Sequence, residues 1–360
     1  MKPHLTIAAM AVIPLALAGC EIGLKDSEQS GYRGTGGVQI TPAGADAEYD
    51  VPAPPYDLPE DTGGPRAGEV YENVQVLGDV SVDEFNYIMA AITEWVSPDE
   101  GCNYCHNPAN MASDEIYTKH VSRKMIQMTQ ALNGEYQSHV GQTGVTCYTC
   151  HRGNNIPEYV WSNASADPDG IVGNKYGGQN GPNPSVGYAS LPSAGFYEAY
   201  LGGEGGAARV QSEQMHPGSN PAGTKDAENQ YAIMMHLSQS LGVNCTYCHN
   251  TQAFGEWSNS GGARATAWHG LQMVKATNRE YIDPLQPVFP DYRLGDEGDP
   301  LKVNCQTCHQ GANKPLGGAQ MAKDYPSLQR LSVPAGLSLV PSAEAAEALM
   351  LPESRREDGE

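Results

Sequence analysis

The stretch GVTCYTCHRG, residues 144–153, places two cysteines three positions apart and a histidine directly after the second. This C-x-x-C-H order occurs four times in the 360-residue chain, and eight of the nine cysteines lie in the four motifs. The motifs are Cys102, Cys105 and His106; Cys147, Cys150 and His151; Cys245, Cys248 and His249; and Cys305, Cys308 and His309. The repeated motif is therefore the first feature that the fold has to explain.

Three chemistries could use these cysteines, and only one of them also uses the histidine. Four C-x-x-C disulfides would each close a very short loop, which constrains an unfolded chain little. Two C-x-x-C pairs could bind zinc through four thiolates, but each histidine would then have no role. C-x-x-C-H is the attachment sequence of c-type haem, whose iron takes the histidine as proximal ligand. The sequence thus predicts four covalently bound haem c groups, with proximal ligands His106, His151, His249 and His309.

The composition agrees with a chain that folds around porphyrins. Only 39% of its residues are hydrophobic, with four Phe and four Trp, whereas Gly and Pro number 41 and 26. Protein cores are normally built from Leu, Ile, Val and Phe. Because these are scarce, we expect four porphyrins to supply the missing apolar volume. The predicted fold is mainly α with a large irregular-coil fraction.

The N-terminus predicts export and lipid attachment. Lys2 precedes an apolar stretch at residues 7–18, the pattern of a signal peptide too short to span a membrane. The sequence LAGC ends at Cys20, the one cysteine outside the motifs, and resembles a bacterial lipobox. We expect residues 1–19 to be a lipoprotein signal peptide. Lipidated Cys20 would then anchor the chain to the periplasmic face of the cytoplasmic membrane.

The net charge of −21 excludes nucleic acid as a partner, and it either favours basic partners or serves solubility alone. Association with a basic partner would be steered by this charge and would slow as the salt concentration rises.

A haem that only carries electrons normally has a second protein ligand, Met or His. Ser81 and Glu84 form a capping-box pattern that predicts a helix ending at Ser97, and Phe85, Met89, Ile92 and Val96 would share one face of it. Met89 lies 13 residues before Cys102, within reach of that iron through a helix and a turn.

The third motif repeats this arrangement. Thr224 caps a predicted helix that Gly242 ends, and in it Met234 precedes Cys245 by 11 residues, with Met235 as the adjacent alternative. Tyr231 and Leu241 would share the face of Met234.

The other two sixth ligands have several candidates. An amphipathic helix before the second motif carries Met125 and Met128 on one stripe. For the fourth haem, MVKATNREY echoes MTQALNGEY and aligns Met273 with Met128, while His139 is a second candidate. Spacing alone does not choose within either pair.

The four motifs fall into two similar pairs. CNYCHN matches CTYCHN, and CYTCHRG matches CQTCHQG, which indicates an internal duplication of a two-haem unit with an approximate twofold relation. The predicted organisation is a signal peptide, an extended N-terminal segment, a first dihaem half, a connecting segment, a second dihaem half and an acidic tail. Their ranges are 1–19, 20–79, 80–155, 156–223, 224–316 and 317–360.

The lipobox, the stretch GYRGTGG at Gly31–Gly37 and the two motif pairs together resemble one known family. GVTCYTCHRG and SLGVNCTYCHN are also similar to its sequences. The family is the tetrahaem cytochrome c subunit of the photosynthetic reaction centres of purple bacteria, and the resemblance covers most of residues 20–316.

The resemblance implies three Met sixth ligands and one His. It pairs Met89 with His106, Met125 with His151, Met234 with His249, and His139 with His309. It gives Met128 and Met273 packing roles.

The implied function is a periplasmic electron relay without an enzymatic activity, since no haem keeps an open coordination position. A soluble donor, either a small c-type cytochrome or a high-potential iron–sulfur protein, would supply electrons. The four haems would pass them to the photo-oxidised bacteriochlorophyll special pair, held by the membrane-embedded reaction-centre subunits. The alternatives are a general multihaem carrier and a multihaem nitrogen-oxide reductase.

Overall fold

The structure is a computed structural model that describes residues 24–29, 37–42, 49–58, 60–163, 184–193, 195–203 and 223–329, without the side chain of Lys225. The predicted signal peptide and Cys20 lie outside the described residues, as do most of Gly31–Gly37, much of the connecting segment and residues 330–360.

The chain divides into two compact units, each built from three separate stretches of sequence. Unit 1 draws its described residues from Met1–Val51, Asn163–Lys275 and Asn304–Gly318. Unit 2 draws them from Pro52–Ser162, Ala276–Val303 and Ala319–Glu360.

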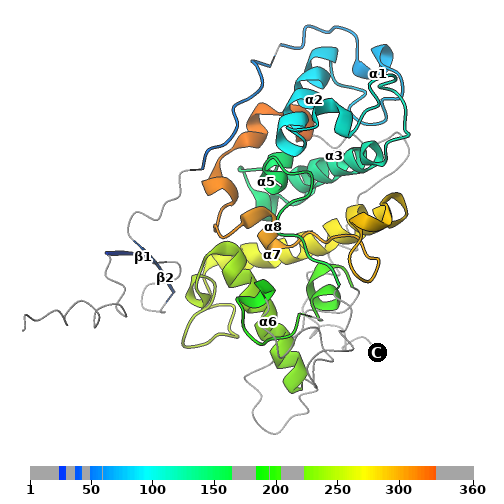
Figure 1. Cartoon of the computed structure of the whole chain (residues 1–360). Helices are drawn as coiled ribbons and strands as arrows, with labels where there is room; N and C mark the ends of the chain where they lie inside the picture. Colours follow the sequence, from blue (N-terminus) through cyan, green and yellow to red (C-terminus); the bar gives the residue numbers. More distant parts are fainter. Residues whose placement is uncertain are drawn as a thin grey trace, which may run out of the picture. The chain divides into compact units, whose positions relative to one another are not determined.

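Helices and irregular coil make up most of the described residues (Figure 1), as the composition predicts. The α-helices are α1 (Ala67–Val70), α2 (Val82–Val96), α3 (Tyr117–Glu135), α4 (Gln137–Val140), α5 (Cys147–His151), α6 (Thr224–Leu241), α7 (Gly262–Thr277) and α8 (Cys305–His309). Short helical turns include η1 (Gly101–Tyr104), η2 (Pro184–Val186), η3 (Tyr197–Leu201), η4 (Cys245–Tyr247), η5 (Asn278–Ile282), η6 (Asp283–Val288), η7 (Asp291–Arg293), η8 (Pro315–Gly318), η9 (Met321–Asp324) and η10 (Pro326–Leu328).

A small sheet that the sequence does not predict lies in unit 1. Strands β1 (Lys25–Gln29) and β2 (Val38–Pro42) pair antiparallel, with Lys25 opposite Pro42. The carbonyl of Val38 accepts hydrogen bonds from Thr246 Oγ1 at 2.7 Å and from Asn244 Nδ2 at 3.1 Å. Part of the segment predicted to be extended therefore pairs with itself and holds the third motif.

Helix α2 begins and ends where the sequence predicts, and it has two apolar faces. The Ser81 side chain accepts a hydrogen bond from the Glu84 backbone N–H at 3.1 Å, and the helix ends at Ser97. One face, which includes Tyr87, Ile88 and Trp95, is buried in the core of unit 2. The other is the predicted stripe of Phe85, Met89, Ile92 and Val96, which is only half-buried. A helix apolar on both sides needs an apolar partner on each.

The described part of the predicted acidic tail is packed against α2. The Tyr325 ring lies 4.6 Å from the Trp95 ring and 5.1 Å from the Tyr87 ring, between ring centroids. Tyr325 and Leu328 are 1% and 0% exposed. Residues 319–329 are therefore core of unit 2, because their aromatic and aliphatic side chains fill the space beside α2.

Helix α6 ends at the predicted Gly242, but Thr224 is its first residue and Gly223 is its cap. The Asp226 carboxylate accepts from the Gly223 N–H at its start, and Gly242 ends it with φ of 61°. A Cβ on Gly242 would collide with the carbonyl oxygen of Gly311. Glycine is thus required there by conformation and by the close approach of the fourth motif. Tyr231, expected on the apolar face with Met234, is instead 61% exposed.

Candidate haem-binding site

The four motifs adopt two conformations, which match the two sequence pairs. The first and third motifs begin in the short 3-10 turns η1 and η4, whereas the second and fourth are the α-helices α5 and α8. Helix α5 packs against α2, and helix α8 packs against α6. Each of these two motifs therefore lies beside the helix that carries the methionine predicted for the preceding haem.

Each motif histidine is oriented by one hydrogen bond. The Nδ1 atoms of His106 and His249 lie 2.9 Å from the carbonyl oxygens of Met111 and Phe254, five residues further on. The Nδ1 atoms of His151 and His309 lie 2.8 and 2.9 Å from the carbonyls of Asn154 and Ala312, three residues further on.

A carbonyl oxygen only accepts, so Nδ1 carries the proton in all four rings. Nε2 is then the lone-pair nitrogen, as an iron ligand requires, and a bond of this kind fixes the ring of a ligating histidine. Burial also lowers the pKa of His151 and of His249, which keeps both imidazoles neutral near pH 7.

The second and fourth motifs are capped in the same way. Thr149 Oγ1 accepts from the N–H of Thr146 at 3.0 Å, and Thr307 Oγ1 accepts from the N–H of Asn304 at 3.0 Å. The residue after each histidine, Arg152 or Gln310, is left-handed with φ of 46° or 48°. The chain therefore leaves the helical conformation directly after each histidine. Each of these motifs is one short helix that carries its two cysteines and its histidine.

Two asparagines hold the coil segments that lead into these motifs. Asn133 exchanges two hydrogen bonds with the backbone of Val145, at 2.7 and 2.8 Å. Asn278 does the same with Val303, both at 2.8 Å. Val145 and Val303 each lie two residues before the first cysteine of their motif. Both asparagines lie in the similar stretches MTQALNGEY and MVKATNREY, so this similarity is the sequence signal for their shared role.

A cavity of about 730 Å³ in unit 2 brings the predicted residues of two haem sites together. Its wall includes Met89 with Cys102, Cys105 and His106 of the first site, and Met125 with Cys147 and His151 of the second. The apolar stripe of α2 also lines it. The second apolar face of that helix therefore borders this cavity rather than protein core.

The methionines of α3 differ in their relation to this cavity. Met125 belongs to its wall with Val121, one turn earlier, whereas Met128 is not among the lining residues. Met125 and Met128 are both half-buried. The two side chains therefore differ in whether they line this cavity and not in how exposed they are.

Two cationic groups on the cavity wall fit an anionic, largely apolar ligand. Arg123 Nη1 and Arg293 Nε are buried and have no hydrogen-bond partner among the described residues. Buried charged donors need a compensating acceptor. Haem presents an apolar macrocycle together with ionised propionates, so the residues present fit this group.

The cysteines do not form the alternative sites. None of the eight motif cysteines is joined in a disulfide, and within the described ranges no group of three or more His, Cys, Asp or Glu side chains is placed to hold a bare metal ion. Burial raises the pKa of Cys147 and of Cys305 to about 12, so both sulfurs are protonated at neutral pH.

The remaining predicted ligands lie on helices outside this cavity wall. Met234 and Met235 lie on α6, and Met235 Cε would be 3.7 Å from a Cβ built on Gly187. His139 lies on the short helix α4 of unit 2, whereas His309 belongs to unit 1.

Comparison with known sequences decides the family. A profile of the photosynthetic reaction centre cytochrome c subunit matches residues 22–329. The chain belongs to this family. It is 48% identical to the photosynthetic reaction center cytochrome c subunit of Thermochromatium tepidum, over 97% of this chain and 86% of that protein. It is also 48% identical to the subunit of Rubrivivax gelatinosus, over 96% of this chain and 92% of that protein. Cytochrome c-554 of Chloroflexus aurantiacus is more distant, at 25% identity over 69% of this chain.

Family membership confirms the resemblance inferred from the motifs. It places the chain among photosynthetic electron-transport proteins that carry covalently bound haem c. Across the part of the chain that the structure describes, no helix is both long and apolar enough to cross a bilayer.

Proposed function

We propose that this chain is an electron relay that binds four haem c groups and feeds a photosynthetic reaction centre. The observation that carries the proposal is the common orientation of the four motif histidines, each with its Nδ1–H on a backbone carbonyl. When bound, haem iron supplies reversible one-electron transfer. The residues of the chain attach the groups, orient the ligands and exclude water.

Met89 and Met125 serve the first and second haems in this proposal. Both line the cavity that also holds His106 and His151. Each methionine carbonyl accepts from a threonine one turn later, Thr93 at 2.8 Å and Thr129 at 2.9 Å. Thioether ligation raises the potential of haem iron relative to a second histidine.

Met234, rather than Met235, serves the third haem. The Gly153 N–H donates to the Trp95 carbonyl, and the Gly311 N–H donates to the Ser240 carbonyl, both at 2.8 Å. Trp95 lies six residues after Met89, and Ser240 lies six residues after Met234. This register makes Met234 the equivalent of Met89.

His139 serves the fourth haem together with His309. The asparagine pair Asn133 and Asn278 sets the register of the two halves, and Met125 lies eight residues before Asn133. The residue eight before Asn278 is Gly270, which has no side chain to ligate iron. The fourth haem therefore needs a ligand from elsewhere in the chain, and His139 supplies it.

The equivalent asparagines, motif helices and glycine contacts support an internal duplication, with the two halves near residues 80–155 and 224–316. With a motif histidine and a second protein side chain to hold each haem, no haem would keep a site for a small substrate, so the proposal includes no enzymatic activity.

The membrane context follows from the N-terminus and the family. Lipidated Cys20 anchors the chain on the periplasmic face, and the membrane-embedded reaction-centre subunits receive its electrons through their bacteriochlorophyll special pair. A small c-type cytochrome or a high-potential iron–sulfur protein is the soluble donor.

Flash spectroscopy on native membranes tests this proposal. A short flash should oxidise haem within the complex, seen as bleaching of the α-band, and the protein should copurify with bacteriochlorophyll. Membranes in which the flash oxidises bacteriochlorophyll but leaves every haem of this chain reduced would point instead to a general multihaem carrier. Carbon monoxide binding to the reduced native protein would favour an enzyme.

A further inference from the structure

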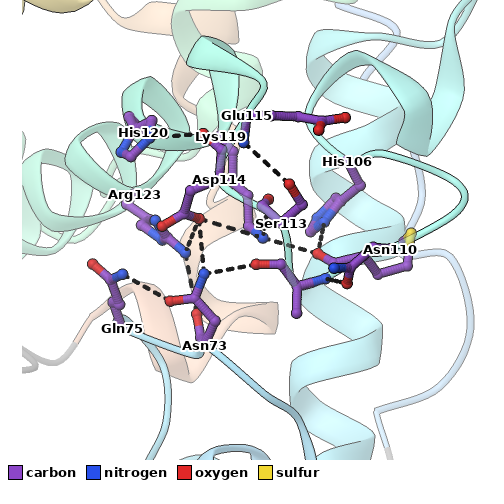
Figure 2. Close-up of polar contacts among 12 residues, drawn as sticks. Asn73, Gln75, His106, Asn110, Ser113, Asp114, Glu115, Lys119, His120 and Arg123 are labelled. Carbon is purple, nitrogen blue, oxygen red and sulfur yellow. Dashed lines mark hydrogen bonds and ion pairs between the residues drawn. The ribbon is translucent and has the colours of Figure 1, made fainter.

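Lys119 places a buried ammonium group behind the first motif (Figure 2). The residue is only 6% exposed, and its Nζ donates to the carbonyls of Met111 and Ser113, each at 2.8 Å. The Asp114 carboxylate lies 3.6 Å away. A buried charge is costly unless it is paired and hydrogen-bonded. Two donors of this ammonium have carbonyl acceptors, and the carboxylate lies within ion-pair distance.

The Met111 carbonyl is shared between Lys119 and the proximal histidine of the first site. It accepts from His106 Nδ1 at 2.9 Å and from Lys119 Nζ at 2.8 Å. A carbonyl oxygen has two lone pairs, so both can be used at once. The ammonium is therefore one carbonyl group away from the imidazole ring, as Figure 2 shows.

The cluster behind His106 places two cations around one carboxylate. Arg123 Nη2 lies 2.9 Å from the Asp114 carboxylate and also donates to the Asn73 carbonyl at 3.1 Å. Asn73 Nδ2 donates to the same carboxylate at 2.8 Å. One carboxylate thus faces two cations, Lys119 and Arg123.

Two further titratable groups border this cluster. His120 Nε2 contacts the backbone carbonyl of Asp114 at 3.0 Å, and the carboxylate of Glu115 accepts from Asn107. Both side chains contact groups other than the Lys119 ammonium.

We propose that Lys119 is a positioning residue that raises the midpoint potential of the haem held by His106. A carbonyl that already accepts from an ammonium is a weaker acceptor for the Nδ1–H of His106. The imidazole then has less imidazolate character and stabilises ferric iron less. The buried positive charge acts in the same direction, because it disfavours the more positive oxidation state. This inference rests on the proposed haem at Cys102 and Cys105.

Equilibrium redox titration of the complete, membrane-isolated protein, followed at the α-bands, tests the proposal. Lys119→Met should lower the midpoint potential of one haem and leave the other three unchanged, and Lys119→Arg should restore most of the loss. Lys119→Gln, which keeps an N–H near the carbonyl without the charge, should give a smaller decrease in the same direction and covers the case in which the Met variant does not assemble.

Lys124→Met is the matched control. It removes the same charge from the same helix, at a side chain whose Nζ lies 4.8 Å from the Tyr281 ring centroid. Four unchanged potentials in Lys119→Met and Lys119→Gln would overturn the inference, as would an equal decrease in Lys124→Met. Haem quantification separates a failure of this inference from a failure of the proposed function. A parent protein without haem at Cys102 and Cys105 would overturn the proposed function itself.

Discussion

The backbone N–H of Gly153 donates to the carbonyl oxygen of Trp95 at 2.8 Å, which ties the turn after the second motif to the helix that carries Met89. Gly153 has φ of 83°, and the equivalent Gly311, which donates to Ser240, has φ of 85°. These left-handed turns follow α5 and α8 directly. They bring the chain to the ends of α2 and α6, the helices that carry Met89 and Met234.

Replacing Gly153 by alanine should therefore destabilise the protein by about 1 to 2 kcal/mol, the usual cost of a left-handed conformation for an L-residue. Space is not the cause, since an added Cβ would meet only Pro98 Cγ, at 3.9 Å. Denaturant unfolding measures the change. Gly262→Ala is the control, because Gly262 lies at the start of α7 with nothing within 4 Å of an added Cβ. Equal effects of the two substitutions would refute the conformational explanation.

Asn133→Ala should destabilise the second motif selectively. The substitution leaves the N–H and carbonyl of Val145 without their partner, in a buried position, at a cost of roughly 2 to 4 kcal/mol. We expect a lower haem content at Cys147 and Cys150, measured by mass analysis of haem peptides. Asn278→Ala should act in the same way on the fourth motif, whereas alanine at the exposed Asn86 should leave all four haems attached. Uniform loss from all motifs in Asn133→Ala would contradict a local clamp.

Met125→His should lower the potential of the second haem, because a second imidazole favours ferric iron more than a thioether does. Met128→His on the same helix is the matched variant, and it should leave all four potentials unchanged since Met128 is not on the cavity wall. Redox titration of both variants measures the difference. A decrease in Met128→His alone would reverse the assignment.

Asp114 should contribute to the loss of stability in acid. A hydrogen bond from Arg123 lowers the pKa of Asp114 below its usual value of 3.8. A lowered folded-state pKa means that the stabilisation is present above pH 3.8 and is lost as the pH falls through the folded value. In Asp114→Asn, the free energy of unfolding should therefore fall less steeply below about pH 4.

Urea unfolding between pH 2 and pH 6 measures this slope. The exposed Asp296 provides the control, and Asp296→Asn should keep the parent slope. If Asp114→Asn also kept it, the ion pair with Arg123 would not affect the pH dependence.

Local sequence signals predicted the parts of the fold that depend on short-range chemistry. The cap at Ser81, the left-handed end at Gly242 and the four motifs are each set by residues a few positions apart. The stripe of Phe85, Met89, Ile92 and Val96 was also correctly identified as one face, and it lines the cavity.

Long-range packing was not predictable in the same way. The Tyr325 ring contacts the Trp95 ring, although more than two hundred residues of sequence separate them. Composition gives no sign of such a contact, so it predicts a tail for the last described segment. In the sequence, Lys119 is one of several charged residues of an amphipathic helix. Only the fold shows that its ammonium shares a carbonyl with His106.

Mass spectrometry of the mature polypeptide and of its haem peptides tests the central claim most directly. We expect four covalently attached haems, one on each of the pairs Cys102 and Cys105, Cys147 and Cys150, Cys245 and Cys248, and Cys305 and Cys308. A mature chain without added haem mass, or with its motif cysteines joined as disulfides, would contradict it.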